Sequence, residues 1–139
     1  MSFMTRSRQR EHVFKLIFQT EAVNEQDICQ HFKNYLNECQ GVSEEDKEAI
    51  EARASKILPF IPEIDRLLNE KTTGWKTNRM NKVDLAILRL AVYEILYDKD
   101  IPERVAINEG VELAKKYSGQ DGPSFVNAVL AKFTENTNG

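Results

Sequence analysis

The amino-acid sequence predicts an all-α protein, and three observations support this prediction. Helix-favouring residues, chiefly Glu, Lys, Ala, Leu and Ile, dominate the composition. The 139 residues include only six Gly and four Pro, too few for a many-turned β-sandwich. The 15 residues from Val83 to Tyr97 contain neither Gly nor Pro and only three charged side chains. This stretch is too long for an ordinary strand, so it indicates a helix buried on several sides.

The N-terminal part of the chain is expected to form two helices. Thr5 or Ser7 is a suitable N-cap for a first helix that ends near Glu21. Its apolar positions follow the i, i+3, i+4 spacing of a helix, whereas its first two turns are almost entirely polar. We therefore expect the polar start of this helix to project past the core. Asn24 can cap a second helix that continues to about Glu38.

Two further helices are expected before the apolar stretch. Ser43, followed by an acidic first turn, suits the start of a third helix that ends near Leu58. Pro59 and Pro62 then bend or restart the chain, because proline is excluded from helix interiors. A fourth helix continues to about Lys71.

The C-terminal half is expected to hold three helices. Asn81 is a suitable N-cap for the central helix, and Pro102 follows its end. A sixth helix continues to Tyr117, and Gly110 within it indicates a closely packed neighbour, since Gly costs about 1 kcal/mol relative to Ala there. Pro123 suits the first turn of a last helix. We expect the central helix to be the most buried, with most of its core contacts made by Leu88, Leu90, Ala91, Val92 and Ile95.

Charge is distributed unevenly along a chain whose formal net charge is −3. Residues 1–15 carry four basic side chains and one acidic side chain. Residues 16–70 carry five basic and twelve acidic side chains, and residues 71–89 carry five basic and one acidic. Such asymmetry is typical of an acidic protein with a site for a polyanion.

The sequence contains no motif for catalysis or metal binding. It lacks a glycine-rich phosphate loop, a GxSxG motif and an HExxH motif. Cys29, His31 and Cys39 come nearest to a zinc set, but residues two apart on a helix point in different directions and the spacing matches no common zinc pattern. We therefore expect no enzymatic activity, no metal and no cofactor.

The cellular setting is expected to be reducing and cytoplasmic. Two cysteines do not make a disulfide framework, and the first residues lack the apolar core of a signal peptide. No stretch of the sequence is long and apolar enough to cross a membrane.

The first helix carries the residues best suited to contact RNA. Arg6 and Arg10 are four residues apart and share a helical face, and Phe14 and Phe18 continue the ridge from Arg10. Guanidinium groups can neutralise phosphates, and aromatic rings can stack on unpaired bases. The same residues also fit a soluble helix end followed by core aromatics, so the pattern alone leaves both interpretations open.

Three charged residues in the central helix are open to similar alternatives. Arg89 interrupts an apolar helix, and a buried charge is costly unless it is paired. Arg89 therefore either has an acidic partner or reaches a surface, and we favour the structural pair over a direct RNA contact. Asp84 is either a favourable first-turn acid or a carboxylate that faces a partner. Lys82 belongs to a basic cluster that either extends an RNA site or balances the acidic half.

Four stretches, in this order and spacing, resemble the NusB family of bacterial transcription antitermination factors. They are TRSRQREHVFKLIFQ, NKVDLAILRLAVYEIL, IPERVAINEGVELAKKY and SFVNAVLAKF. The resemblance extends over nearly the whole chain; it is least diagnostic at residues 22–75 and most specific from Leu88 to Leu130. It implies about seven helices in two small packed helical subdomains, within a single domain 1–139 whose halves cover about residues 1–75 and 76–135.

The resemblance also implies a function and its partners. Similar proteins bind the boxA element of nascent RNA together with NusE, a ribosomal small-subunit protein, and help RNA polymerase read through terminators, notably in ribosomal RNA operons. An adaptor with the same fold and weak RNA binding of its own is the alternative, and an accessory domain for RNA modification is a more distant one. Some relatives form homodimers, and the sequence does not decide whether this chain does.

Particular residues match positions with known roles in the family. Ser7 departs from the most basic members, and Phe18 stands where Tyr is common, so that a hydroxyl is lost but a stacking face is kept. Asp84 matches the surface linked to NusE. The arginine-rich helix start of the family corresponds to Arg6, Arg8 and Arg10, and Asp121 and Phe125 match positions linked to RNA binding. With Phe18 and the two basic residues of the central helix, the expected RNA-binding set is Arg6, Arg8, Arg10, Phe18, Lys82, Arg89, Asp121 and Phe125.

Overall fold

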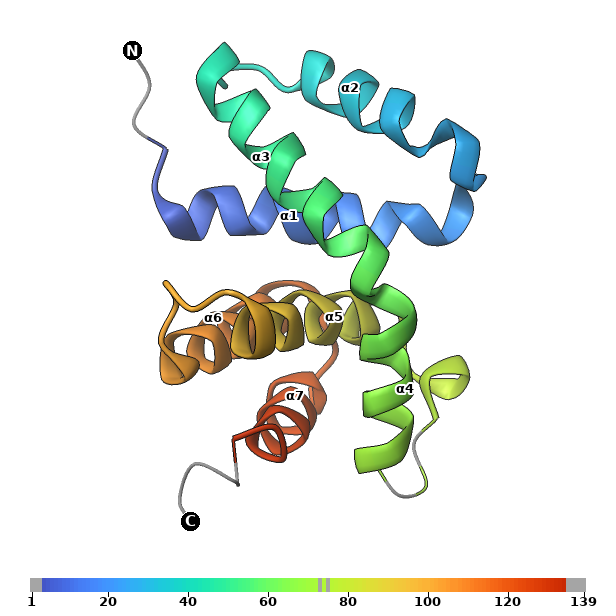
Figure 1. The fold of residues 1–139 in the computed structure, drawn as a ribbon. Coiled ribbons are helices and arrows are strands. Elements are labelled where there is room, and N and C mark those ends of the chain that lie inside the picture. Colours follow the sequence, from blue (N-terminus) through green and yellow to red (C-terminus); the bar gives the residue numbers. More distant parts are fainter. Residues whose placement is uncertain (1–3, 73, 75, 135–139) are drawn as a thin grey trace. The chain divides into compact units, whose positions relative to one another are not determined.

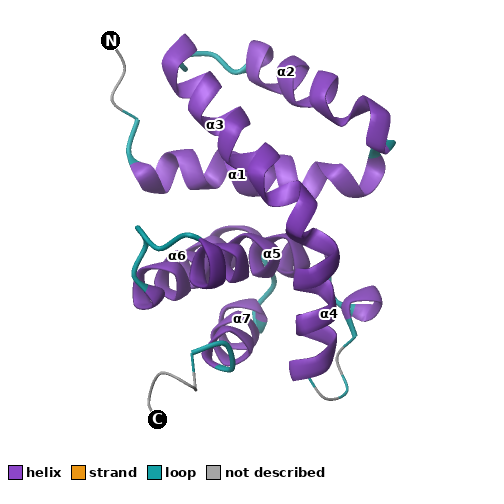
Figure 2. Ribbon diagram, in the orientation of Figure 1, coloured by secondary structure: helices purple, strands orange, loops and turns teal. Residues whose placement is uncertain are grey.

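The computed structural model describes residues 4–72, 74 and 76–134. Throughout these residues the chain forms helices, turns and loops, with no strand (Figures 1 and 2). This confirms the all-α prediction. The α-helices of the described residues are α1 (Arg6–Gln19), α2 (Ile28–Glu38), α3 (Glu44–Ile57), α4 (Ile61–Lys71), α5 (Lys82–Tyr97), α6 (Glu103–Tyr117) and α7 (Gly122–Ala131). None of these helices is long and apolar enough to span a bilayer.

Three of the predicted N-caps are confirmed. The side chains of Thr5, Ser43 and Asn81 each accept a hydrogen bond from the backbone N–H three residues later, at the starts of α1, α3 and α5. Asn24 makes no such bond, because a 3-10 turn, Glu25–Asp27, precedes α2. Cap residues act locally, which is why the sequence indicates them well.

The chain divides into two compact units, Met1–Pro59 and Phe60–Gly139. The sequence led us to expect a division near residue 75. The difference concerns α4, which packs against α5 and joins it through the ion pair between Asp65 and Arg89. The fourth helix therefore belongs with the C-terminal unit.

The N-terminal unit is built on α3, which packs against both α1 and α2. The helical spacing predicted for α1 is confirmed, since Val13, Leu16 and Ile17 are fully buried. The other buried apolar side chains of this unit are Phe14, Phe32, Leu36, Ile50, Ala54 and Ile57.

The C-terminal unit is built on α5, against which α4, α6 and α7 pack. Every residue from Asp84 to Val92 is buried, as predicted for the central helix. Ile95 is only half-buried and Leu96 is exposed, so the expectation that Ile95 is a main core residue is wrong. Aromatic side chains pack together at the last turns of α5. The ring centroid of Phe60 lies 5.5 Å from that of Tyr93 and 4.4 Å from that of Tyr97.

Gly110 lies where α6 meets both α5 and α7. A Cβ atom at this position would come within 3.1 Å of Leu130 Cδ1 on α7 and within 3.5 Å of the Cβ of Ala91 on α5. The close neighbour predicted from the sequence is therefore present, and glycine lets three helices approach one another.

Candidate nucleic-acid interface

The first turns of α1 present two exposed arginines. Arg6 is exposed, and the side chain of Arg8 is 52% exposed. The guanidinium of Arg8 donates a 2.6 Å hydrogen bond to the carboxylate of Glu11, one turn further along. Arg8 can therefore reach an anion in solvent only in competition with Glu11.

The third arginine of α1 is buried. Arg10 is 3% exposed, and Glu11 and His12 after it are buried as well. Arg10 precedes the core residues Val13 and Phe14 by three and four positions, so the helix turns all three toward the same face. The expectation that the polar start projects past the core is therefore wrong from Arg10 onward.

The ridge from Arg10 through Phe14 to Phe18 is mostly part of the core. Phe14 is buried, whereas Phe18 is 39% exposed. The two rings are tilted against each other with their centroids 6.5 Å apart. Only Phe18 thus keeps accessible ring surface on which a base could stack.

His12 is a buried titratable group on the same helix. Its Nδ1 lies 3.0 Å from the hydroxyl of Tyr35 on α2, and its buried Nε2 has no hydrogen-bond partner within the described residues. Burial, followed by the positive charges of Arg8 and Lys15, lowers the pKa of His12, while Glu11 acts in the opposite direction. The neutral imidazole is therefore the favoured form in the folded protein.

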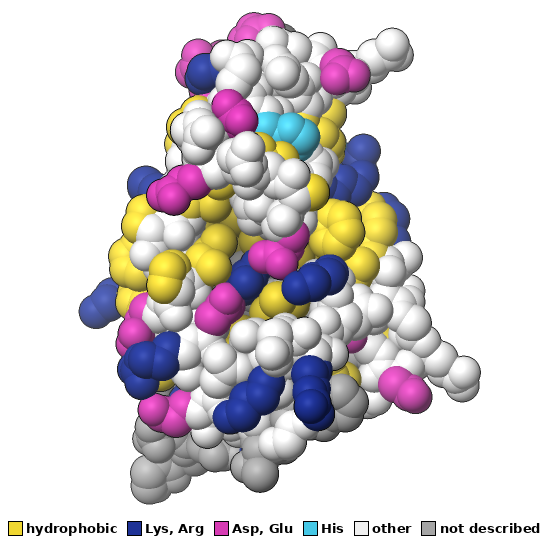
Figure 3. Space-filling view, turned by 90° about the vertical axis from the view of Figure 1, so that its right-hand side faces the viewer, with side chains coloured by type: hydrophobic (Ala, Val, Ile, Leu, Met, Phe, Trp, Pro, Cys, Tyr) yellow, Lys and Arg dark blue, Asp and Glu magenta, His cyan; other side chains and the backbone are white. Residues whose placement is uncertain are grey.

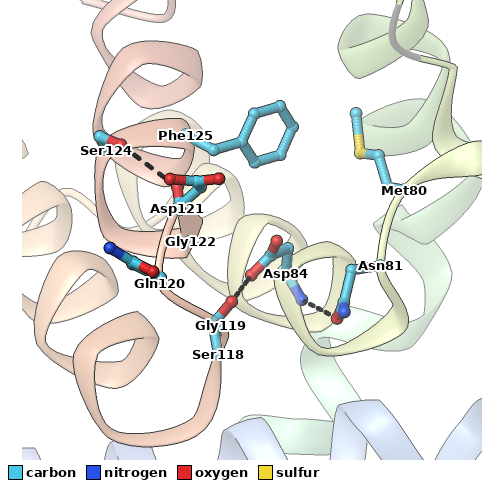
Figure 4. A pocket seen from close by; sticks show the side chains of 10 residues that line it. All are labelled: Met80, Asn81, Asp84, Ser118, Gly119, Gln120, Asp121, Gly122, Ser124 and Phe125. Atoms are coloured by element: carbon cyan, nitrogen blue, oxygen red, sulfur yellow. Dashed lines mark hydrogen bonds between the residues drawn. The ribbon is translucent and has the colours of Figure 1, made fainter.

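A pocket of about 600 Å³ lies in the C-terminal unit, between the start of α5, the α6–α7 loop and the start of α7 (Figure 4). Its volume is in the range of small-molecule sites. The side chains of Phe125, from α7, and Met80, from the segment before α5, stand on opposite sides of it. Asp121 is exposed at the N-cap position of α7, and its carbonyl oxygen accepts a 3.2 Å hydrogen bond from Ser124.

Asp84 lines this pocket but is 8% exposed. One of its carboxylate oxygens accepts a 2.5 Å hydrogen bond from the hydroxyl of Ser118 in the α6–α7 loop. Its backbone N–H is capped by Asn81. Asp84 is therefore a hydrogen-bonded carboxylate that leaves little exposed surface for a direct contact with a partner protein.

The two basic residues expected on α5 differ in exposure. Arg89 is buried, and its Nε and Nη2 atoms donate hydrogen bonds of 2.9 and 2.7 Å to the two carboxylate oxygens of Asp65 on α4. This is the structural pair that we favoured from the sequence. Lys82 is exposed in the first turn of α5. Neither side chain lines the pocket.

The surface shown in Figure 3 carries both signs of charge. Acidic and basic side chains are interspersed there, with hydrophobic side chains between them. On the exposed side of α4, Arg66 pairs with both Glu63 and Glu70. The hydrogen bond from Arg66 lowers the pKa of Glu63. A surface of mixed sign is a poor match for a polyanion.

The cysteines and histidine considered as a zinc set do not form a cluster. Cys29 is exposed, and the Nε2 atom of His31 lies 2.5 Å from the side-chain oxygen of Gln19. Within the part of the chain that the structure describes, no three His, Cys, Asp or Glu residues are placed to hold a metal ion.

The structure thus groups the sequence-predicted residues by unit. Asp84, Asp121 and Phe125 meet at one pocket of the C-terminal unit, while Arg6, Arg8 and Phe18 are exposed on α1. The sequence did not indicate four further polar and apolar side chains of the pocket, since they lie in a loop, beside a cap or in the first turn of α7, where there is no periodic pattern. These residues are Met80, Ser118, Gln120 and Ser124.

Comparison with known proteins places this arrangement in a family. The model of the NusB family matches residues 7–135. The chain belongs to the NusB family. The transcription antitermination protein NusB of Agathobacter rectalis is 49% identical over 130 residues, which cover 94% of this chain and 99% of that protein. The NusB of Lachnoclostridium phytofermentans is 43% identical, with coverage of 93% and 98%.

Solved NusB structures share the fold. That of T. maritima NusB has a TM-score of 0.85 and 34% sequence identity, and the match covers 96% of this chain and 93% of that one. A crystal structure of the antitermination factors NusB and NusE in complex with double-stranded RNA has a TM-score of 0.78 at 23% identity, covering 96% and 99%. At that identity the second likeness extends to the fold alone.

Proposed function

We propose that this NusB-family chain is a non-enzymatic, cytoplasmic RNA-binding factor of transcription antitermination. It binds the boxA element of nascent RNA together with NusE and supports read-through by RNA polymerase, notably in ribosomal RNA operons. Family membership and the names of its relatives support the general role. The NusB–NusE–RNA complex with the same fold supports the choice of partners.

The pocket beside Phe125 is the observation that carries the RNA assignment. It combines an aromatic ring, the exposed carboxylate of Asp121 and the exposed amide of Gln120 around a hollow of about 600 Å³. Proteins recognise single-stranded RNA by stacking unpaired bases on aromatic rings and by hydrogen-bonding their edges. This set of groups suits an unpaired base. In double-stranded RNA the bases are stacked and paired with each other, so their faces and pairing edges are not accessible.

The exposed cations complete the proposed RNA contact. Arg6 and Arg8 supply charge for phosphates on α1, and Phe18 supplies a second stacking surface. Lys82 adds a positive charge one residue after the cap of α5. Arg10 and Arg89 have a different role in this proposal, since both are buried and stabilise the fold that carries the exposed residues.

The NusE surface is proposed to lie near the start of α5. Asp84 itself is buried, so its contribution to NusE binding is expected to come through the shape of the surrounding surface. A substitution such as Asp84→Lys would replace a buried carboxylate by an ammonium group that cannot accept the hydrogen bond from Ser118, so it is unsuited to testing this contact.

Titration of a labelled boxA RNA, with and without NusE, tests the proposed function. We expect measurable binding by the chain alone and tighter binding by the pair, because two proteins that hold adjoining parts of one strand bind it cooperatively. Binding only in the presence of NusE would support the adaptor alternative. Binding in neither case, with a scrambled RNA as the control, would refute the proposal.

A further inference from the structure

We infer that Asp84 is a positioning residue, which holds the α6–α7 loop through Ser118 and so presents Asp121 and Phe125 to RNA. This inference rests on the proposed function and adds to it a residue that acts without touching RNA. It also assigns to Asp84 a role that differs from a direct contact with NusE.

The first step of the argument is the hydrogen bond itself. The hydroxyl of Ser118 donates to a carboxylate oxygen of Asp84 over 2.5 Å (Figure 4). Asp84 is 8% exposed, and hydrogen bonds to ionised groups in such surroundings are short and roughly twice as strong as neutral ones. The bond joins two residues 34 positions apart, so it fixes the loop to α5 and not merely to its own neighbours.

The second step is the tightness of the loop. Only four residues connect the end of α6 at Tyr117 with the start of α7 at Gly122. A Cβ atom at Gly122 would overlap the Ser118 hydroxyl and would lie 3.3 Å from a carboxylate oxygen of Asp84. Gly122 is buried, and its N–H donates a 3.0 Å hydrogen bond to the carbonyl oxygen of Gly119. The loop therefore closes directly over the Asp84–Ser118 bond.

The third step is what this loop carries. Gln120 and Asp121 are exposed on it, and the N–H of Phe125 donates a 3.1 Å hydrogen bond to the Asp121 carbonyl as α7 begins. A hydrogen bond that holds Ser118 therefore restrains the loop that leads into α7, from whose first turn the Phe125 side chain projects. A binding surface ordered before RNA arrives avoids the entropy cost of ordering it on binding.

The test uses variants of the full chain that remove or keep the bond. Ser118→Ala and Asp84→Ala remove it, whereas Ser118→Thr and Asp84→Asn keep a donor and an acceptor. Asp98→Ala is the matched control, because it removes a carboxylate that accepts an exposed hydrogen bond at the other end of α5. Circular dichroism first establishes that each variant is folded.

Two measurements are made on these variants. Amide hydrogen exchange of Gly119–Gly122 in the free protein reports on the loop without RNA. We expect faster exchange there in Ser118→Ala and Asp84→Ala, and wild-type exchange in Ser118→Thr and Asp98→Ala. Asp84→Asn should lie between these two groups, because its amide oxygen still accepts the hydrogen bond but carries no charge. In boxA titrations we expect the two alanine variants to lose about tenfold in affinity with an unchanged salt slope, because no phosphate contact is removed.

The double variant separates positioning from direct contact. If both residues act through one bond, Ser118→Ala with Asp84→Ala binds RNA as weakly as the weaker single variant. Additive losses, or a loss in Asp84→Ala alone, would overturn the inference in favour of a direct RNA contact. Unchanged exchange in both single variants would overturn it whatever the RNA result. If wild type fails to bind RNA while exchange responds as expected, the proposed function fails and not the fixing of the loop.

Discussion

Both units of this protein bury charged side chains, but they hold them differently. In the C-terminal unit, two buried charged residues of α5 have partners on other elements: Arg89 forms two hydrogen bonds with Asp65, and Asp84 accepts one from Ser118. In the N-terminal unit, α1 buries Arg10, Glu11 and His12 in succession. Glu11 pairs with Arg8 on the same helix, and His12 lies against Tyr35 on α2 with one nitrogen that has no partner within the described residues.

The difference teaches which sequence patterns predict burial. Arg89 stands within an apolar helix, so its burial and need for a partner can be inferred from its neighbours. Arg10 stands within a polar run, which suggests exposure, yet its position relative to Val13 and Phe14 turns it toward the core. Helical phase is therefore a better guide than local polarity at the border between a polar and an apolar segment.

The largest expected effect comes from breaking the ion pair of the C-terminal unit. Asp65→Ala leaves the buried guanidinium of Arg89 without its carboxylate. We expect a loss of about 2–4 kcal/mol in the free energy of unfolding, since Asp65 retains some contact with solvent. Urea denaturation measures this loss.

Glu63→Ala is the matched control on the same helix, because Glu63 forms an exposed ion pair with Arg66. We expect Glu63→Ala to change stability much less than Asp65→Ala. Equal effects of the two substitutions would show that burial does not distinguish these ion pairs.

The arginines of α1 give the corresponding test in the N-terminal unit. Arg10→Ala should lower the free energy of unfolding by about 1–3 kcal/mol, because it removes buried side-chain packing and polar contacts. Arg6→Ala, on the exposed side of the same helix, should leave the urea midpoint near that of wild type. If Arg10→Ala is equally neutral, Arg10 is not part of the folded framework and the contrast with Arg6 disappears.

Much of the fold could be predicted because its signals are local. The caps Thr5, Ser43 and Asn81, the apolar run of α5 and the close approach at Gly110 all follow from residue type and spacing. The placement of α4 with the C-terminal unit could not be predicted, because it depends on a pairing between Asp65 and Arg89, which lie 24 positions apart.

The smallest expected effect concerns the pH dependence of stability. Folding lowers the pKa of His12, so the folded state binds fewer protons than the unfolded state near the ordinary histidine value of about 6.5. Above a pH of about 6.5, His12 is mostly neutral in both states and does not reduce the free energy of unfolding. As the pH falls below this value, protonation of His12 in the unfolded state lowers the free energy of unfolding. We expect urea midpoints between pH 7.5 and about 5.5 to fall less in His12→Gln than in wild type. Parallel pH profiles would exclude His12 as the source.

The candidate site was only partly predictable. Asp121 and Phe125 follow from the family resemblance, and the structure places them at one pocket with Asp84. The Asp84–Ser118 bond could not be predicted, because a loop serine 34 residues away leaves no periodic signal in the sequence. The expectation that Arg10 contacts RNA rests on the charge of its segment, on its ridge with Phe14 and Phe18, and on the family resemblance. None of these shows whether the side chain is buried, and Arg10 is.

The central claim is that exposed arginines of α1 bind phosphates while the pocket at Phe125 binds a base. Titration of boxA RNA at several salt concentrations tests it most directly. Arg6→Ala with Arg8→Ala should reduce the salt slope of log affinity by about 1.4, at about 0.7 per phosphate on a single strand. Phe125→Ala should weaken binding by about 1–3 kcal/mol with the wild-type slope, since stacking releases no counterions. A wild-type slope and affinity in the arginine variant would contradict the account and direct attention to the exposed cations near Lys82.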